Sequence, residues 1–199
     1  MTSGSDLRSH PVFKGSSGLT PPIQMHQWAE CSVMQIPDVS TPARYAAVGV
    51  ENLIRHNPVE TGVFIGPDGA THLKRKGWNN RVSFTRQELK CVKGATFTHN
   101  HPNGYGPSLD DVHLGAAYGL KEVRVVTANF RHGLSMLNAV YFVPLFRAFA
   151  VEKSAALSAA QDDVKRGLIH PSDFGVEVLH RTWQGMAARL GFDYWRLQS

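Results

Sequence analysis

The stretch THNHPNGYGPSLDD, residues 98–111, joins the end of an apolar run to a glycine-rich turn and a helix start. His99 and His101 stand two residues apart, and because side chains alternate between the two faces of a strand, both imidazoles point to one side. Ser108 followed by Asp111 three residues later is a pattern that begins helices. The stretch therefore predicts a strand, a tight loop and a helix whose first turn comes back toward the two histidines.

Each of these patterns has an ordinary explanation when it occurs alone. His-x-His is more often a solvated or hydrogen-bonded pair, Ser-x-x-Asp is a common helix cap, and HPNGYGP is typical of a turn. In combination they predict a metal site, because a carboxylate in the first helical turn can reach the point that both imidazoles face. Two histidines and one aspartate form a ligand set for zinc that leaves a fourth position for water.

The rest of the chain predicts an α/β or α+β domain around this stretch, since strands and helices alternate along it. The predicted helices are residues 42–56, 85–90 and 108–119, and the predicted strands are residues 59–65, 70–74, 82–84, 95–99, 122–127 and 133–137. Pro42 fits the first turn of the first helix, and Asn57-Pro58 ends that helix.

Three parts are predicted along the chain. Residues 1–22 are rich in Ser, Gly and Pro and predict a flexible arm. Residues 23–140 form the main domain, in which 23–40 is either helix or strand. Residues 141–199 predict a helical extension packed on the core, with amphipathic helices at 143–168 and 173–190 and Gly191 as a C-cap.

Aromatic residues give two further expectations. Trp183, Tyr194 and Trp195 of the extension are expected to dock its helices on the core. Trp78 is expected to be a packing residue rather than a functional one.

Composition limits the class of protein. The chain has 199 residues and no run of about 20 apolar residues, so no membrane span is expected. It lacks a signal-peptide pattern, which makes a cytoplasmic location the default, while secretion by a route that needs no such signal stays open.

Its two cysteines, Cys31 and Cys91, do not form a disulfide framework. The net charge of +5, with a short run at Lys74–Lys76, leaves contact with nucleic acid open.

The motif His-x-His-Pro followed by Ser-x-x-Asp resembles the signature of JAMM (MPN-plus) metallopeptidases. Within that family it looks most like bacterial RadC-type and phage-related members. The resemblance covers roughly residues 42–137 and implies a JAMM/cytidine-deaminase-like mixed sheet flanked by helices. It also implies zinc ligands at His99, His101 and Asp111, and a serine, Ser108, that steadies the oxyanion.

The family's glutamate, which handles the proton of the attacking water, follows the first helix, and Glu60 matches it in the segment ETGVFIG. Glu51 is the weaker candidate and is expected to be a solvated helix residue. Asp110 is an alternative candidate for a metal ligand, and His113 is a candidate to contact the metal or the substrate. Asn103 and Tyr105 are candidates to line the cleft. Six residues separate His101 from Ser108, one fewer than in the best-known members of the family.

The resemblance implies a zinc-dependent hydrolase that cleaves a peptide or isopeptide bond, with a peptide or a ubiquitin-like protein as substrate. The alternative is a catalytically silent binding module of phage or host-targeted type that contacts nucleic acid through its basic surface. A third possibility is another metal-dependent hydrolase, such as a nuclease. Zinc binding and the salt dependence of nucleic-acid affinity separate these classes.

Overall fold

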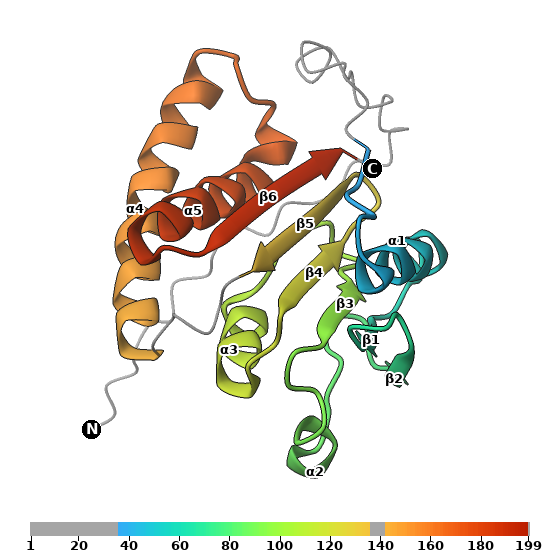
Figure 1. Cartoon of the computed structure of the whole chain (residues 1–199). Helices are drawn as coiled ribbons and strands as arrows, with labels where there is room; N and C mark the ends of the chain where they lie inside the picture. The colour runs from blue at the N-terminus through green and yellow to red at the C-terminus, as the bar shows by residue number, and fades with distance from the viewer. Residues whose placement is uncertain (1–35, 136–141, 199) are drawn as a thin grey trace, which may run out of the picture. The chain divides into compact units, whose positions relative to one another are not determined.

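The computed structural model describes residues 36–135 and 142–198. Its centre is a six-stranded sheet in the order β2-β1-β3-β4-β5-β6 (Figure 1). The central pair β3–β4 is parallel, and all other neighbouring strands are antiparallel. The chain is therefore a mixed α/β structure, as the alternation of elements predicted, and the predicted arm at 1–22 lies outside the described residues.

The strands are β1 (Thr61–Ile65), β2 (Thr71–Lys76), β3 (Thr96–Asn100), β4 (Glu122–Val126), β5 (Phe130–Ser135) and β6 (Asp193–Gln198). The helices are α1 (Pro42–Ile54), α2 (Arg86–Leu89), α3 (Leu109–Tyr118), α4 (Phe142–Lys165) and α5 (Phe174–Leu190), with a short 3₁₀ turn at Pro171–Asp173. Among these described elements, no helix combines the length and apolarity needed to cross a membrane.

Two apolar clusters divide the helices between the faces of the sheet. Helix α1 packs Ala43 and Ala47 against Val63 and Ile65 of β1. The larger cluster lies on the opposite face, where side chains of β1, β3, β4 and β5 meet α2, α3, α4 and α5. Because side chains alternate along a strand, Phe97 and His99 of β3 face this larger cluster, whereas the intervening Thr98 faces α1.

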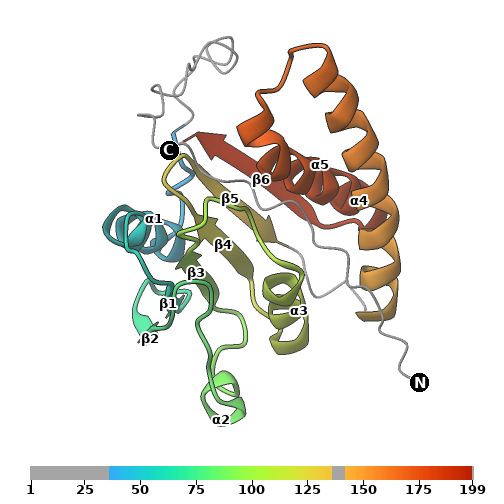
Figure 2. The ribbon, with the colours of Figure 1, turned by 180° about the vertical axis from the view of Figure 1, so that it is seen from behind.

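The C-terminal region contains a strand that the amphipathic pattern did not predict. Helices α4 and α5 form close to the predicted bounds, and Gly191 ends α5 in a left-handed conformation with φ 73°. The chain then turns into β6, which pairs antiparallel with β5 at the edge of the sheet, beside α5 (Figure 2). Tyr194 and Trp195 thus belong to a sheet strand, and the sheet extends past residue 140 into the predicted helical extension.

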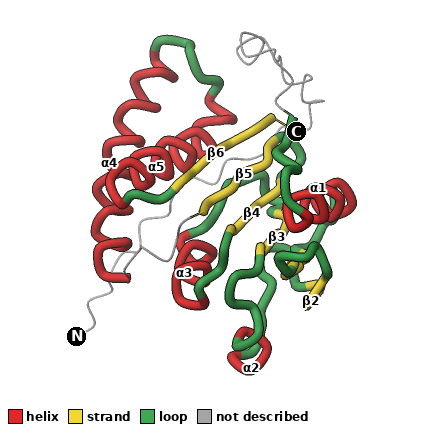
Figure 3. Tube along the Cα trace, in the orientation of Figure 1, coloured by secondary structure: helices red, strands yellow, loops and turns green. Residues whose placement is uncertain are grey.

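Two smaller predictions between β2 and α2 are wrong. Residues 82–84 form no strand, and only an isolated bridge joins Trp78 to Arg81. The Trp78 side chain is 79% exposed and is not a packing residue. The segment between β2 and α2 runs as a loop (Figure 3), and its residues 80–84 line a cleft.

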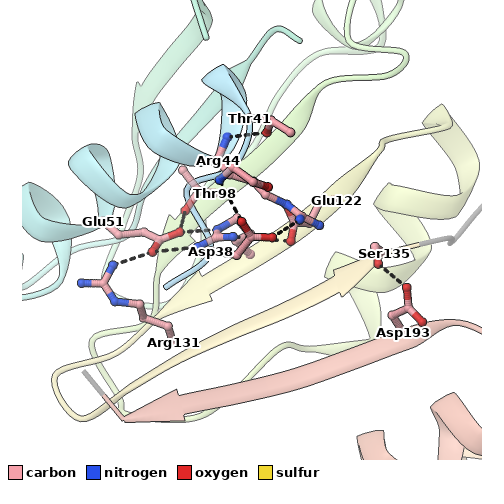
Figure 4. Close-up of polar contacts among 11 residues, drawn as sticks. Asp38, Thr41, Arg44, Glu51, Thr98, Glu122, Arg131, Ser135 and Asp193 are labelled. Atoms are coloured by element: carbon pink, nitrogen blue, oxygen red, sulfur yellow. Dashed lines mark hydrogen bonds and ion pairs between the residues drawn. The ribbon is translucent and has the colours of Figure 1, made fainter. Parts of the chain in front are cut away.

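Glu51 is not a solvated helix residue, as the sequence suggested, but one of the most buried carboxylates of the fold, with 1% of its surface exposed. Its Oε1 lies 2.6 Å from Arg124 Nε and its Oε2 lies 2.8 Å from Arg131 Nη1. The Thr98 hydroxyl donates to Oε1 at 3.2 Å (Figure 4). Glu51 therefore joins α1 to β4 and β5 through ion pairs and to β3 through a hydrogen bond.

Replacing Glu51 with Gln is expected to destabilise the fold by about 2–3 kcal/mol, because buried Arg131 loses its counter-charge and buried Arg124 keeps only Glu122, at 3.4 Å, while the shape is kept. Urea unfolding gives the free energy of unfolding. The control is Asp162→Asn, which removes an exposed pair with Lys165 and should change the stability by no more than about 0.5 kcal/mol. Equal stability of the two variants would show that the buried network adds nothing.

Candidate metal centre

Strand β3 presents two histidines at its carboxyl end. His99 pairs across the sheet with Gly62 of β1 and Val125 of β4, and only 1% of its surface is exposed. Its ring stacks on Phe97, with 4.6 Å between the ring centroids. His101 follows the strand, and its backbone N–H donates to the Val126 carbonyl at 3.0 Å. This bond continues the strand geometry past Asn100, so both imidazoles are on the same face, as the i, i+2 spacing predicted.

The first turn of α3 supplies the carboxylate. Ser108 is the N-cap, and its Oγ accepts from the Asp111 backbone N–H at 3.2 Å. Asp111 Oδ2 in turn accepts from the backbone N–H and the hydroxyl of Ser108, each at 2.7 Å. This capping box orients the carboxylate, and its other oxygen, Oδ1, faces His99. Capping and metal binding are therefore compatible in the same pair of residues.

Two imidazole nitrogens and the carboxylate of Asp111 converge at this point. His99 Nε2 lies 3.0 Å from His101 Nε2 and 3.1 Å from Asp111 Oδ1, and His101 Nε2 lies 3.6 Å from Asp111 Oδ2. Ligand atoms bound tetrahedrally to zinc at about 2.0–2.1 Å are themselves about 3.3 Å apart. The observed separations, which run to different oxygens of Asp111 for the two histidines, lie on both sides of that value, and one ligand atom from each residue lies within 4.8 Å of the others. The three side chains are therefore close enough to share a single small cation.

The loop between β3 and α3 sets the tautomer of His101. Its Nδ1 lies 3.1 Å from the carbonyl oxygen of Tyr105 and 3.0 Å from that of Gly106. Because both partners are acceptors, Nδ1 carries the proton and the lone pair of Nε2 points toward His99 and Asp111, as in metal-binding histidines. Gly104, with φ 81°, takes the left-handed conformation that lets six residues complete this turn.

Glu60 lies beside the three converging groups. It directly precedes β1, and its backbone continues the pairing with the β2 side through bonds to Trp78 and Gly77, each 2.7 Å long. The side chain is buried, and its Oε1 lies 3.8 Å from His101 Nε2. Burial raises the pKa of the Glu60 carboxyl, and the Asp111 carboxylate adds to this effect while His99 opposes it.

The pKa values of the other three groups show where positive charge is favoured. Burial opposes protonation of His99, but Asp111 and Glu60 outweigh it and raise the pKa of His99. Burial and the neighbouring His99 lower the pKa of His101. Although Asp111 is buried, the two histidines and Ser108 hold its pKa well below its usual range. The cluster thus keeps an ionised carboxylate and favours a cation between it and the imidazoles, which fits a metal ion.

A cleft of about 530 Å³ opens over this cluster, and Glu60, His101, Ser108 and Asp111 line it. Asn103, Tyr105 and Asp110 also line it, whereas His113 is not among the residues that line it or form the cluster. The sequence did not indicate the segment 80–84 or Leu179 of α5 as part of this site. No local pattern could have identified Leu179, because only the packing of α5 brings it to the cleft.

The C-terminal region supports the loop that carries His101. Trp183 of α5 is fully buried, and its Nε1 donates to the Pro107 carbonyl at 2.7 Å. A Cβ atom on Gly106 would lie 3.0 Å from the ring of His132, whose Nδ1 lies 3.0 Å from the Tyr194 hydroxyl. Trp183 of α5 and His132 of β5 therefore contact this loop directly, and Tyr194 of β6 contacts His132. The expected docking role of Trp183 is confirmed, since it belongs to the main apolar cluster with Phe97 of β3 and Val123 of β4.

Comparison with known proteins found no match of this chain to a family model, to a curated protein or to a solved structure.

Proposed function

We propose that this protein is a zinc-dependent hydrolase that cleaves an amide bond, either peptide or isopeptide, in the manner of the JAMM metallopeptidases that its motif resembles. The observation that carries the proposal is the convergence of His99, His101 and Asp111 within 4.8 Å, next to the buried carboxylate of Glu60 and on the wall of a cleft. The same resemblance assigns the mixed sheet to the JAMM/cytidine-deaminase-like type.

Zinc is the favoured metal because two imidazoles and one carboxylate form the donor set of many catalytic zinc sites. A zinc ion held there would supply a Lewis acid and would make hydroxide available near neutral pH, since zinc lowers the pKa of water to about 7. The short spacing of the ligand atoms and the set tautomer of His101 argue against the ordinary explanation of a solvated histidine pair.

Glu60 has the position of a general base. Its carboxylate lies within 4 Å of a ligand but belongs to a different strand end, so it faces the cleft beside the metal group. In the proposed reaction it accepts a proton from the attacking water and later gives that proton to the leaving amine.

Ser108 would stabilise the oxygen of the substrate carbonyl as negative charge develops on it. Its hydroxyl now donates to Asp111 Oδ2 and lines the cleft. Because the Ser108 backbone N–H also donates to that oxygen, the hydroxyl can turn toward a substrate without leaving the carboxylate unpartnered.

The proposal is tested by metal content and by metal-dependent hydrolysis. Protein purified without a metal-affinity tag, given zinc and then dialysed, is expected to keep one zinc per chain by elemental analysis. His99→Ala should release the zinc, because one of three protein ligands is gone, whereas His113→Ala should keep it. Wild-type protein that retains no metal would contradict the proposal. It would favour the silent binding module instead.

A further inference from the structure

A second cavity, of about 290 Å³, lies next to the cleft of the metal centre. Tyr105 and Leu179 line both, so the two spaces are neighbours. The walls of the second cavity come from the C-terminal helices, with Leu157 from α4 and Phe174, Val178 and Leu179 from α5. Its size is close to the lower end of ligand pockets, about 300 Å³, and its lining is mostly apolar.

Tyr105 connects the cavity to the metal centre. Its carbonyl oxygen accepts the hydrogen bond that orients His101, and its ring lies against α5 at Gly175. A Cβ atom on residue 175 would lie 2.9 Å from the Tyr105 hydroxyl, so the absence of a side chain there makes room for this ring. Because Tyr105 and Leu179 line both spaces, the second cavity is the neighbour of a peptide that crosses the metal centre on the side of Tyr105.

The rim of the cavity carries positive charge. Lys153 of α4 lines it and is exposed, and its ammonium lies 5.8 Å from the centre of the Phe149 ring. None of the described residues that line this cavity has a carboxylate. An apolar group inside the cavity would thus place the next residue of its chain near a cation, where a carboxylate is favoured.

We propose that this cavity is a substrate subsite that takes one large apolar side chain of a peptide, of the size of Leu or Phe, with an acidic residue next to it. The inference rests on the proposed function, because it assumes that the peptide crossing the metal centre is the substrate. It adds a specificity that comes from the helices of residues 142–190 rather than from the metal-binding motif. The occupant is identified by continuity with the cleft, by the apolar walls and by Lys153.

Binding is tested without any need for cleavage, by methyl NMR of the full chain titrated with capped dipeptides. Acetyl-Leu-Asp-amide is expected to shift the methyl signals of Leu157, Val178 and Leu179. Acetyl-Ala-Asp-amide should bind at least about fivefold more weakly, because it buries less apolar surface. Acetyl-Leu-Lys-amide should bind about twofold to fivefold more weakly, as expected for one exposed charge pair. Equal shifts with all three probes, or none at these methyl groups, would overturn the proposal.

Three variants on α4 distinguish an effect at the cavity from a general effect on the helix. Leu157→Glu should weaken acetyl-Leu-Asp-amide at least about fivefold by placing a charge on an apolar wall. Lys153→Glu should reverse the preference between the Asp and Lys probes, and it remains informative if Leu157→Glu fails to fold. The matched control is Val151→Glu, an exposed apolar residue of the same helix that does not line the cavity, and it should bind like wild type.

A cleavage library completes the test. Zinc-loaded wild type is mixed with capped peptides that contain both α-linked and lysine ε-linked amides, and mass spectrometry locates the cleaved bonds. One position near the bond should be enriched in Leu, Phe, Ile or Met beside an acidic residue, and Lys153→Glu should remove the acidic preference. Cleavage with no apolar preference would overturn the subsite and leave the proposed function standing. Dipeptide binding with no chelator-sensitive cleavage would contradict the proposed function alone.

Discussion

Glu60→Gln is expected to bind zinc as wild type does and to lose at least about a hundredfold in the rate of hydrolysis. Gln keeps the size of Glu and its hydrogen bonding but has no basicity, so the water loses its proton acceptor while the three proposed zinc ligands stay in place. The Glu60 carboxylate approaches His101 Nε2 only to 3.8 Å, which places it beside the ligand group rather than in it. Rates with any substrate cleaved in a chelator-sensitive way, together with zinc content, give both readouts.

Two controls make this result specific. His101→Ala removes one of the proposed zinc ligands and should lose zinc and activity together. Asp110→Asn changes an exposed carboxylate that lines the same cleft and should keep both within a few-fold, because Asp110 is outside the converging group. Hydrolysis by Glu60→Gln at the wild-type rate would make Glu60 a structural residue, and the JAMM-type mechanism would fail for this chain.

Trp183→Ala is expected to lower the free energy of unfolding by about 3–5 kcal/mol, as for other large aromatic side chains removed from a core. Trp183 is fully buried, packs in the main apolar cluster and donates to the Pro107 carbonyl. Its removal leaves a cavity and an unsatisfied carbonyl next to the helix that starts at Ser108. Chemical denaturation should be measured with a chelator present, because bound metal would stabilise the folded state by mass action.

Trp78→Ala is the matched control for this prediction. It removes the same side chain from a position that is 79% exposed, so the stability should change by no more than about 0.5 kcal/mol. If both tryptophan variants unfold at the same denaturant concentration as wild type, α5 adds little to the stability of the core. The C-terminal helices would then have to be regarded as a separate module.

Local patterns in the sequence were sufficient for the central part of the site. The i, i+2 spacing of His99 and His101 predicted a common face because strand geometry repeats every two residues. The Ser108–Asp111 pair predicted a helix start because a capping box forms within four residues of chain. The short loop of six residues also brings the two halves together, since Gly104 can take a left-handed conformation.

Contacts between residues far apart in the sequence determine the burial of Glu51 and the pairing of β6, which these local patterns could not predict. Glu51 looked solvated on α1, but its counter-charges are Arg124 and Arg131, which are 73 and 80 residues away. Residues 193–198 carry no strong strand pattern, and they form β6 because β5 offers an unpaired edge beside them. Neither burial nor strand pairing of this kind can be read from neighbours in the chain.

The sequence by itself determined the common face of His99 and His101 and the helix cap at Ser108, because each depends on residues a few positions apart. Only the tertiary structure decided that Glu60 stands within 4 Å of His101, that the segment 80–84 borders the cleft and that α4 and α5 build a cavity behind Tyr105. These features depend on which faces of distant elements pack together, and that choice is made by burial of apolar surface over the whole sheet rather than by any one motif.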